Sequence, residues 1–227
     1  MKPVKIVVLI AIFLCGKQAF SQTGSFTPEW AYGINGGMTL SKVGFNSYLT
    51  VPQEYLKQYS GGITVRYISE QTFGIQVELN YSQRGWKERT DSVNLNNSYA
   101  RSIAYLEIPI MTHVYFNLGK PVRLIFNIGP QIGFYIGEKE VGIINIHNYK
   151  ENEAGDSYYR TSVQHSFDYG LKGSMGLEFR TKIGSFILDG RYYFGLSDIF
   201  NSTRGDFFQA SPNQIIGVNL SYLFRTK

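Results

Sequence analysis

Charged side chains recur at alternate positions of segments that are otherwise rich in aliphatic and aromatic residues. Five acids, six bases and one histidine follow this pattern, and their near balance suits ion pairing as well as it suits acid–base chemistry. We therefore take them as one candidate polar network with a structural role. Its members are Arg66, Glu78, Arg84, Glu107, His113, Arg123, Asp168, Lys172, Glu178, Arg180, Asp189 and Arg191.

Histidine is the side chain most often used for proton transfer near neutral pH, and the chain has three histidines. His113 shares its alternation with Glu107 and Arg123, and we interpret it as a hydrogen-bonding member of the network. Three scattered histidines match no transition-metal spacing. We expect no catalytic residue, no cofactor and no metal site.

In the segments that must position these residues, apolar and polar side chains alternate with a period of two. The alternation is clearest over 105–116 and 121–135. In the first, aliphatic residues at even positions oppose Glu107 and His113 at odd positions. The second is equally regular, with Ile125 as the one aliphatic residue on the polar face. This period is typical of β-strands. Long strands that are apolar on one face suit either a soluble barrel or a membrane barrel.

The whole chain repeats this pattern. We predict eight strands, at about 30–40, 61–69, 73–84, 105–116, 121–135, 167–180, 186–194 and 216–224. The connections alternate long and short, and the long ones are 41–60, 85–97, 138–163 and 196–212. Strands that run up and down a bilayer with short turns at one end produce this order. The sequence therefore predicts an all-β, eight-stranded antiparallel up-and-down transmembrane β-barrel.

An apolar outer face places the charged face inside, where eight strands leave room for little more than side chains. Nearly equal numbers of acids and bases predict a plugged lumen rather than a channel, since buried charges must pair. Pro109 and Pro130 fall inside strands and each lacks a backbone donor. We expect a local bulge or a bound water at each.

The first residues have the features of a secretory signal peptide. Lys2 and Lys5 precede the apolar run 6–14, and small residues stand before Gln22. We predict a cleaved signal over 1–21 and a barrel domain over 22–227. Without the signal, the lysines and arginines fall from 22 to nineteen against 17 acids, which argues against a nucleic-acid partner. The single cysteine, Cys15, leaves with the signal, which excludes disulfides.

Four segments resemble the PorT-like outer-membrane β-barrel family of Bacteroidetes, often labelled "porin family". They are Tyr105-Leu-Glu-Ile-Pro, Gly129-Pro-Gln-Ile-Gly133, Asp168 to Phe179 with its spaced glycines, and Tyr193-Phe-Gly-Leu-Ser-Asp-Ile199. Two depart slightly from the family pattern, in the spacing of Gly170, Gly173 and Gly176 and in the position of Tyr193. The resemblance implies an eight-stranded outer-membrane barrel without a wide pore. It also implies a possible link to secretion, since PorT belongs to the type IX secretion machinery.

We therefore expect a non-enzymatic structural or interaction protein in the outer membrane of a Gram-negative bacterium. Long loops would face outward and both termini would lie in the periplasm. The expected partners are outer-membrane lipid or lipopolysaccharide, together with proteins bound through the loops, and we expect a monomer.

Three alternatives stay open from the sequence. The first is a narrow pore for small solutes. The second is a lipid-modifying enzyme, in which His147 or His165 acts with Asp156 and Ser157 as base and nucleophile. The third is a soluble lipocalin-like barrel, which would hold the apolar face inside.

Overall fold

The computed structural model describes residues 26–43, 53–88, 99–140, 163, 165–198 and 212–226. In this part of the chain no helix is long and apolar enough to cross a membrane. The predicted signal peptide and most of the four predicted long loops lie outside the described residues. The signal peptide stays a prediction.

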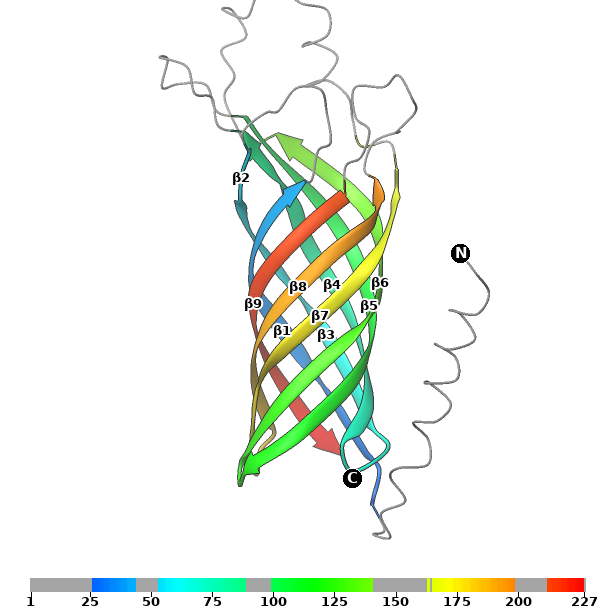
Figure 1. Ribbon diagram of the computed structural model, residues 1–227, viewed down its shortest axis with the longest axis vertical. Helices are drawn as coiled ribbons and strands as arrows, with labels where there is room; N and C mark the ends of the chain where they lie inside the picture. The colour runs from blue at the N-terminus through cyan, green and yellow to red at the C-terminus, as the bar shows by residue number, and fades with distance from the viewer. Residues whose placement is uncertain are drawn as a thin grey trace, which may run out of the picture.

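The described residues form one closed antiparallel sheet (Figure 1). Its strands are β1 (Glu29–Val43), β2 (Gln53–Glu54), β3 (Leu56–Ile68), β4 (Phe73–Glu88), β5 (Tyr99–Gly119), β6 (Val122–Glu140), β7 (Phe167–Arg180), β8 (Ser185–Asp198) and β9 (Pro212–Thr226). Neighbours around the wall are β4, β3, β1, β9, β8, β7, β6 and β5, and pairing of β4 with β5 closes the ring. β2 is a two-residue piece that pairs with β4 just before β3 begins. The wall is thus an eight-stranded up-and-down barrel, and the predicted fold class is confirmed.

All eight predicted strands are present in the predicted order, and several are longer than predicted. β5 begins at Tyr99 and β6 continues to Glu140, so this hairpin extends well beyond the predicted end near residue 135. The added residues of β5 no longer alternate large apolar with polar side chains, since the outward positions carry Ala100, Ser102 and Ala104 and the inward Arg101 lies over the ring of Trp86. A strand that leaves the apolar layer no longer needs an apolar face, so its period disappears from the sequence while its backbone pairing continues.

Short turns join β3 to β4, β5 to β6 and β7 to β8, and all three lie at the end of the barrel where β1 begins and β9 ends (Figure 1). The β7–β8 turn is closed by a hydrogen bond from the Thr181 amide to the Gly184 carbonyl oxygen, 2.8 Å. Gly184 has a φ of +154°, which favours glycine at this position. The connections 44–52, 89–98, 141–162 and 199–211 join strands at the other end.

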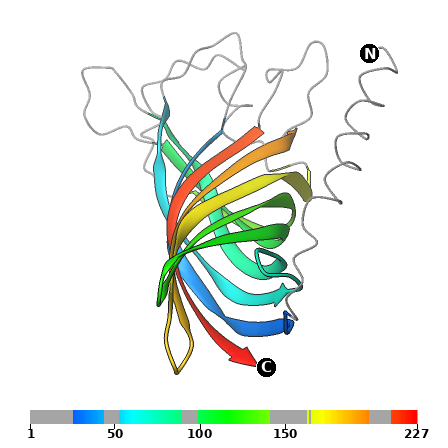
Figure 2. The ribbon, with the colours of Figure 1, turned by 60° about the horizontal axis from the view of Figure 1, so that its bottom comes forward.

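The two faces of the wall differ as the alternation predicts. Ile128 and Leu220 on the outer surface are each 65% exposed, whereas His113 on the inner surface is fully buried. Figure 2 shows the strands tilted around this interior. The apolar face is outside, so the soluble lipocalin-like alternative, which requires the opposite, is wrong.

The expected bulges at the two prolines are absent. Pro109 lies opposite Gln131, and the same register resumes where Thr112 lies opposite Ile128. Pro130 keeps its register with β7. Individual ladder pairs are missing beside Pro109, which accommodates the missing donor without an extra residue. Register shifts in this hairpin occur elsewhere, between residues 104 and 105 and between 117 and 119.

Candidate functional site

The structure places all twelve predicted network residues on the inner face of the barrel. Nine are buried, and Arg123, Arg180 and Arg191 are partly buried. They divide into three buried clusters along the lumen, of which the first and third are joined through Gln76, and a separate pair of arginines at its short-turn end.

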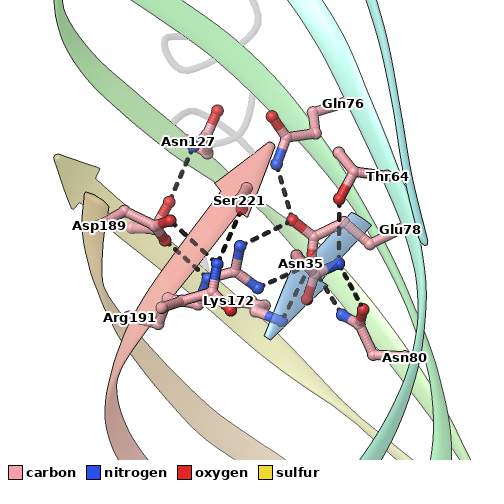
Figure 3. Close-up of polar contacts among 12 residues, drawn as sticks. Asn35, Thr64, Gln76, Glu78, Asn80, Asn127, Lys172, Asp189, Arg191 and Ser221 are labelled. Carbon is pink, nitrogen blue, oxygen red and sulfur yellow. Dashed lines mark hydrogen bonds and ion pairs between the residues drawn. The ribbon is translucent and has the colours of Figure 1, made fainter. Parts of the chain in front are cut away.

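Glu78 is the centre of the first cluster (Figure 3). Arg191 donates to both of its carboxylate oxygens, at 2.9 and 3.1 Å. The amides of Gln76 and Asn80 donate to the same carboxylate at 2.7 and 2.8 Å, and the Lys172 ammonium lies 3.6 Å away. Glu78 is 1% exposed. One carboxylate thus satisfies two cations that come from the other side of the barrel.

Uncharged polar residues extend this cluster around the lumen. The Asn35 amide donates to Thr64 at 3.0 Å and to Asn80 at 2.9 Å. Asn219 donates to Asp189 at 3.2 Å, and Asp189 also accepts from the Arg191 Nε at 2.6 Å. These amides are not among the twelve predicted network residues, which share a charged or titratable side chain. Their inward position follows from the same period of two.

Arg84 is the centre of the second cluster, nearer the end with the long connections. Its guanidinium donates to Glu107 at 2.8 Å and to Asp168. It lies between the rings of Tyr105 and Tyr193, 4.6 and 4.5 Å from their centres. The planar guanidinium contacts both rings and both carboxylates. Any other side chain at this position would lose some of these contacts.

The third cluster lies on the short-turn side of the first. Arg66 donates twice to Gln76, at 2.9 and 2.6 Å, and once to Glu178, at 3.3 Å. His113 contacts Asn127 through its Nδ1, at 2.7 Å. This histidine therefore has an amide partner, and the Glu107 that shares its strand is bonded to the second cluster. Among the described residues, His113 makes no hydrogen bond to a carboxylate or to a nucleophile of the kind that a catalytic histidine uses.

Arg123 and Arg180, both assigned to the lumen network, lie instead at its short-turn mouth. Arg180 reaches across to Glu29, with 2.5 Å between Nη2 and Oε2. Arg123 donates to Asn117 at 2.9 Å and lies 4.0 Å from the centre of the Tyr115 ring. Among the described residues neither arginine is hydrogen-bonded to the buried clusters, although Arg123 lies opposite Glu178 on the neighbouring strand.

An apolar layer lies toward the short-turn end of the lumen, beside the third cluster, with Ala31 opposite Arg66 and Ile187 opposite Glu178. Its buried residues come from six strands and are Ala31, Ile68, Tyr115, Ile125, Ile187 and Leu223. Ile125, the aliphatic residue on the polar face of the sequence pattern, is one of them and is fully buried. Aliphatic side chains of this kind cannot hydrate a passing ion.

A cavity of about 30 Å³ remains between the first and second clusters. It is lined in part by Glu107, Gln131, Lys172 and Arg191. Gln131 is 1% exposed, and neither amide atom has a partner among the described residues. A cavity of this size has room for one or two waters, which is far below the volume of a small-molecule site.

The loop alternative for catalysis finds little support in the described residues. His165 is exposed just before β7, and His147, Asp156 and Ser157 lie outside the described residues. Within the described part of the chain, no group of three histidine, cysteine or acidic side chains could hold a metal ion.

A closed antiparallel barrel with an apolar outer surface and paired charges inside is a transmembrane β-barrel, because hydrocarbon tolerates no open sheet edge. The chain belongs to the outer membrane protein beta-barrel domain family, whose model matches residues 20–201. It is therefore an outer-membrane β-barrel protein of the Gram-negative type. None of the curated proteins matches the chain.

Solved structures with a similar fold are outer-membrane proteins. Ail of Yersinia pestis, in complex with the heparin analogue sucrose octasulfate, is 14% identical over 86% of this chain and 99% of its own, with a TM-score of 0.41. OprG from Pseudomonas aeruginosa is 12% identical over 87% and 95%, with a TM-score of 0.49. Neisserial surface protein A is 11% identical over 85% and 96%, with a TM-score of 0.43.

The apolar outer surface gives a depth-dependent prediction. Leu220 lies near the middle of β9 and is 65% exposed, whereas Leu196 lies near the end of β8 and is 53% exposed. We expect Leu220→Arg to lower the free energy of unfolding in lipid by about 2–4 kcal/mol and Leu196→Arg by at most about 1 kcal/mol, because arginine at the bilayer centre has no access to water. Urea titration of the folded barrel in bilayers measures both, and equal effects would contradict the membrane position of this wall.

Proposed function

We propose that this protein is a closed, non-enzymatic outer-membrane barrel that acts as a structural or interaction protein. The observation that carries the proposal is the filling of the lumen: three clusters of paired charges, an apolar layer, and a cavity of about 30 Å³ between two of the clusters. A lumen filled in this way serves as a rigid support. Contacts with partners then fall to the ends of the barrel.

The proposed orientation puts the long connections outside the cell and both termini in the periplasm. The alternation of short and long connections supports it, since bacterial outer-membrane barrels have short periplasmic turns. We further propose that the barrel is a monomer that contacts outer-membrane lipid and binds proteins through its long connections. Labelling of single cysteines placed in the β7–β8 turn tests the orientation. If a membrane-impermeant reagent labelled these cysteines in intact cells, the proposed orientation would be overturned.

The closed lumen predicts the absence of ion conduction. Purified barrel inserted into a planar bilayer should show no steady single-channel current, because an ion would have to cross the apolar layer and break the Glu78–Arg191 pair. A stable conductance would favour the narrow-pore alternative. Insertion is verified separately by the shift in gel mobility that folded barrels show before boiling.

The proposed absence of enzymatic activity is tested on membrane lipids. His113 contacts an amide and no nucleophile, and this contact supports the proposal for the lumen. Lipid A from a deletion strain should have the same mass as lipid A from the wild-type strain. A difference that is restored by the wild type but not by His147→Ala or His165→Ala would establish the lipid-modifying alternative.

We also propose that the chain belongs to the PorT-like branch of its family, on the four sequence segments that resemble it. A role in secretion or in the cell envelope would follow from that assignment. Crosslinking of the intact barrel in its own outer membrane, followed by identification of the captured proteins, tests it. Capture of no secretion component would contradict the secretion role.

A further inference from the structure

Three lysines gather on the outer surface of the barrel, where β1, β3 and β4 reach the end with the long connections. Lys42, Lys57 and Lys87 each occupy an outward position near that end of its strand. The Lys42 ammonium lies 5.1 Å from the centre of the Tyr55 ring, and the Lys87 Nζ lies 3.3 Å from the Glu54 carboxylate. Since residues 54 and 55 are adjacent, these contacts join Lys42 and Lys87 into one surface, which we call the lysine cluster.

Lys57 completes the cluster. It lies on β3 opposite Leu40 of β1 and two positions from Tyr55, so it shares their outward face. Diagonal neighbours on one face of a sheet lie about 7–8 Å apart. Lys57 is exposed and forms no ion pair with any described residue. Its ammonium is therefore available to a ligand.

The three lysines outnumber the acids beside them in the described residues. Glu54 contacts the cluster, and Glu88 follows Lys87 on β4 opposite Gln53. The other side of the same end is acidic among the described residues. Its charged residues there are Arg101, Glu138, Lys139, Glu140 and Asp198. Among the described residues at this height, the lysine side thus carries a net positive charge and the other side a net negative one.

The lysine cluster lies directly above an apolar part of the wall. Met38, Tyr59 and Ile63 lie on the same outer face and are 46%, 59% and 53% exposed. Tyr67, on the same face, follows Lys57 by ten positions in the sequence. At about 3.3 Å per residue and a tilt of about 40°, this separation corresponds to roughly 25 Å of height, the thickness of the apolar band of outer-membrane barrels. The lysines therefore stand where acyl chains end and headgroups begin.

We propose that the lysine cluster is a binding site for the phosphate groups of a lipid headgroup in the outer leaflet. Lysine binds phosphate as a point charge, and its aliphatic stem can lie along an apolar wall while the ammonium reaches the headgroup. The acyl chains of the same lipid would pack on Met38, Tyr59 and Ile63. This inference rests on the proposed orientation, with the long connections at the outer leaflet.

The test compares two lipids that differ only in phosphate. Folded barrel in nanodiscs is titrated with bisphosphorylated lipid A and with the same lipid after removal of its phosphates, and bound lipid is counted by native mass spectrometry. The triple variant Lys42→Gln, Lys57→Gln and Lys87→Gln should lose roughly 30- to 100-fold in affinity for the phosphorylated lipid, since each lysine near a membrane surface contributes about three- to fivefold. Its affinity for the dephosphorylated lipid should not change.

A matched control removes the same charge elsewhere. Lys120, Lys139 and Lys182 are exposed and lie outside the cluster, and their triple change to glutamine should leave both affinities unchanged. An equal loss in the control would show non-specific attraction and overturn the site. If inorganic phosphate at millimolar concentration fully displaced the phosphorylated lipid, the cluster would be a site for a free anion, and the proposed lipid site would be overturned. Failure of the wild type to insert at all, seen by gel mobility, would instead overturn the proposed function.

Discussion

Glu78→Gln is expected to lower the free energy of unfolding by about 3–5 kcal/mol, one of the two largest single effects in this protein. The glutamine keeps the shape of the side chain but removes its charge. Arg191 and Lys172 would then remain inside the lumen without a full counter-charge, and both are partly or wholly buried. The cost comes mainly from these two cations rather than from the lost hydrogen bonds.

Glu54→Gln is the matched control for this prediction. Glu54 also pairs with a lysine, at 3.3 Å, but both side chains are more than two-fifths exposed. Exposed pairs contribute at most about 1 kcal/mol, so this variant should unfold almost as the wild type does. Urea titration in detergent micelles, followed by gel mobility, measures both variants.

A compensating change distinguishes buried charge from lost packing. If unpaired cations cause the loss, then adding Lys172→Met to Glu78→Gln should recover part of the stability, since Glu78 is the acid with which Lys172 forms an ion pair. A double variant that is less stable than Glu78→Gln by the full cost of Lys172→Met alone would contradict this account of the first cluster.

Arg84→Met is expected to have an effect of similar size, about 3–5 kcal/mol. Arg84 is fully buried, and its removal leaves Glu107 and Asp168 facing one another without the cation that joins them. The methionine can still fill the space between Tyr105 and Tyr193, so the loss reports charge more than volume.

Arg84→Lys separates charge from shape. Lysine keeps the positive charge but cannot donate to two carboxylates through a planar fork or stack between two rings. We expect an intermediate loss, of roughly 1–3 kcal/mol. Arg123→Met at the short-turn mouth is the control, because that side chain is half-buried and has one hydrogen bond; its loss should be about 1 kcal/mol. Equal losses at residues 84 and 123 would contradict the difference between the buried cluster and the mouth.

Much of the barrel follows from the sequence because the signal is local. In a strand, successive side chains point to opposite faces, so the alternation around Glu107 and His113 determines both the strand and the face on which they lie. The rhythm of long and short connections then determines the up-and-down order. The same reasoning identified Ile125 as an exception on the inner face, although it did not reveal the apolar layer that Ile125 helps to form.

Strand ends were harder to predict. The period disappears where the wall leaves the apolar band, because small or polar residues take the outward positions there, and such a segment resembles a loop. β5 therefore begins six residues before its predicted start at residue 105. Proline raised a similar difficulty. Its missing backbone N–H predicts a disrupted strand pairing, whereas the register of β5 with β6 is the same on both sides of Pro109.

The choice of partners inside the lumen belongs to the tertiary structure alone. Glu78 and Arg191 are separated by 113 positions, Arg66 and Glu178 by 112. Which charges meet depends on the register between strands and on their tilt around the barrel, because these set the height of each residue. Charge balance predicts that the inward residues pair, but it contains no information on height. The sequence by itself therefore determined the barrel and the members of its interior. Only the closed, tilted wall decided that they form three clusters, that Arg123 and Arg180 lie at the mouth, and that Lys42, Lys57 and Lys87 share one surface.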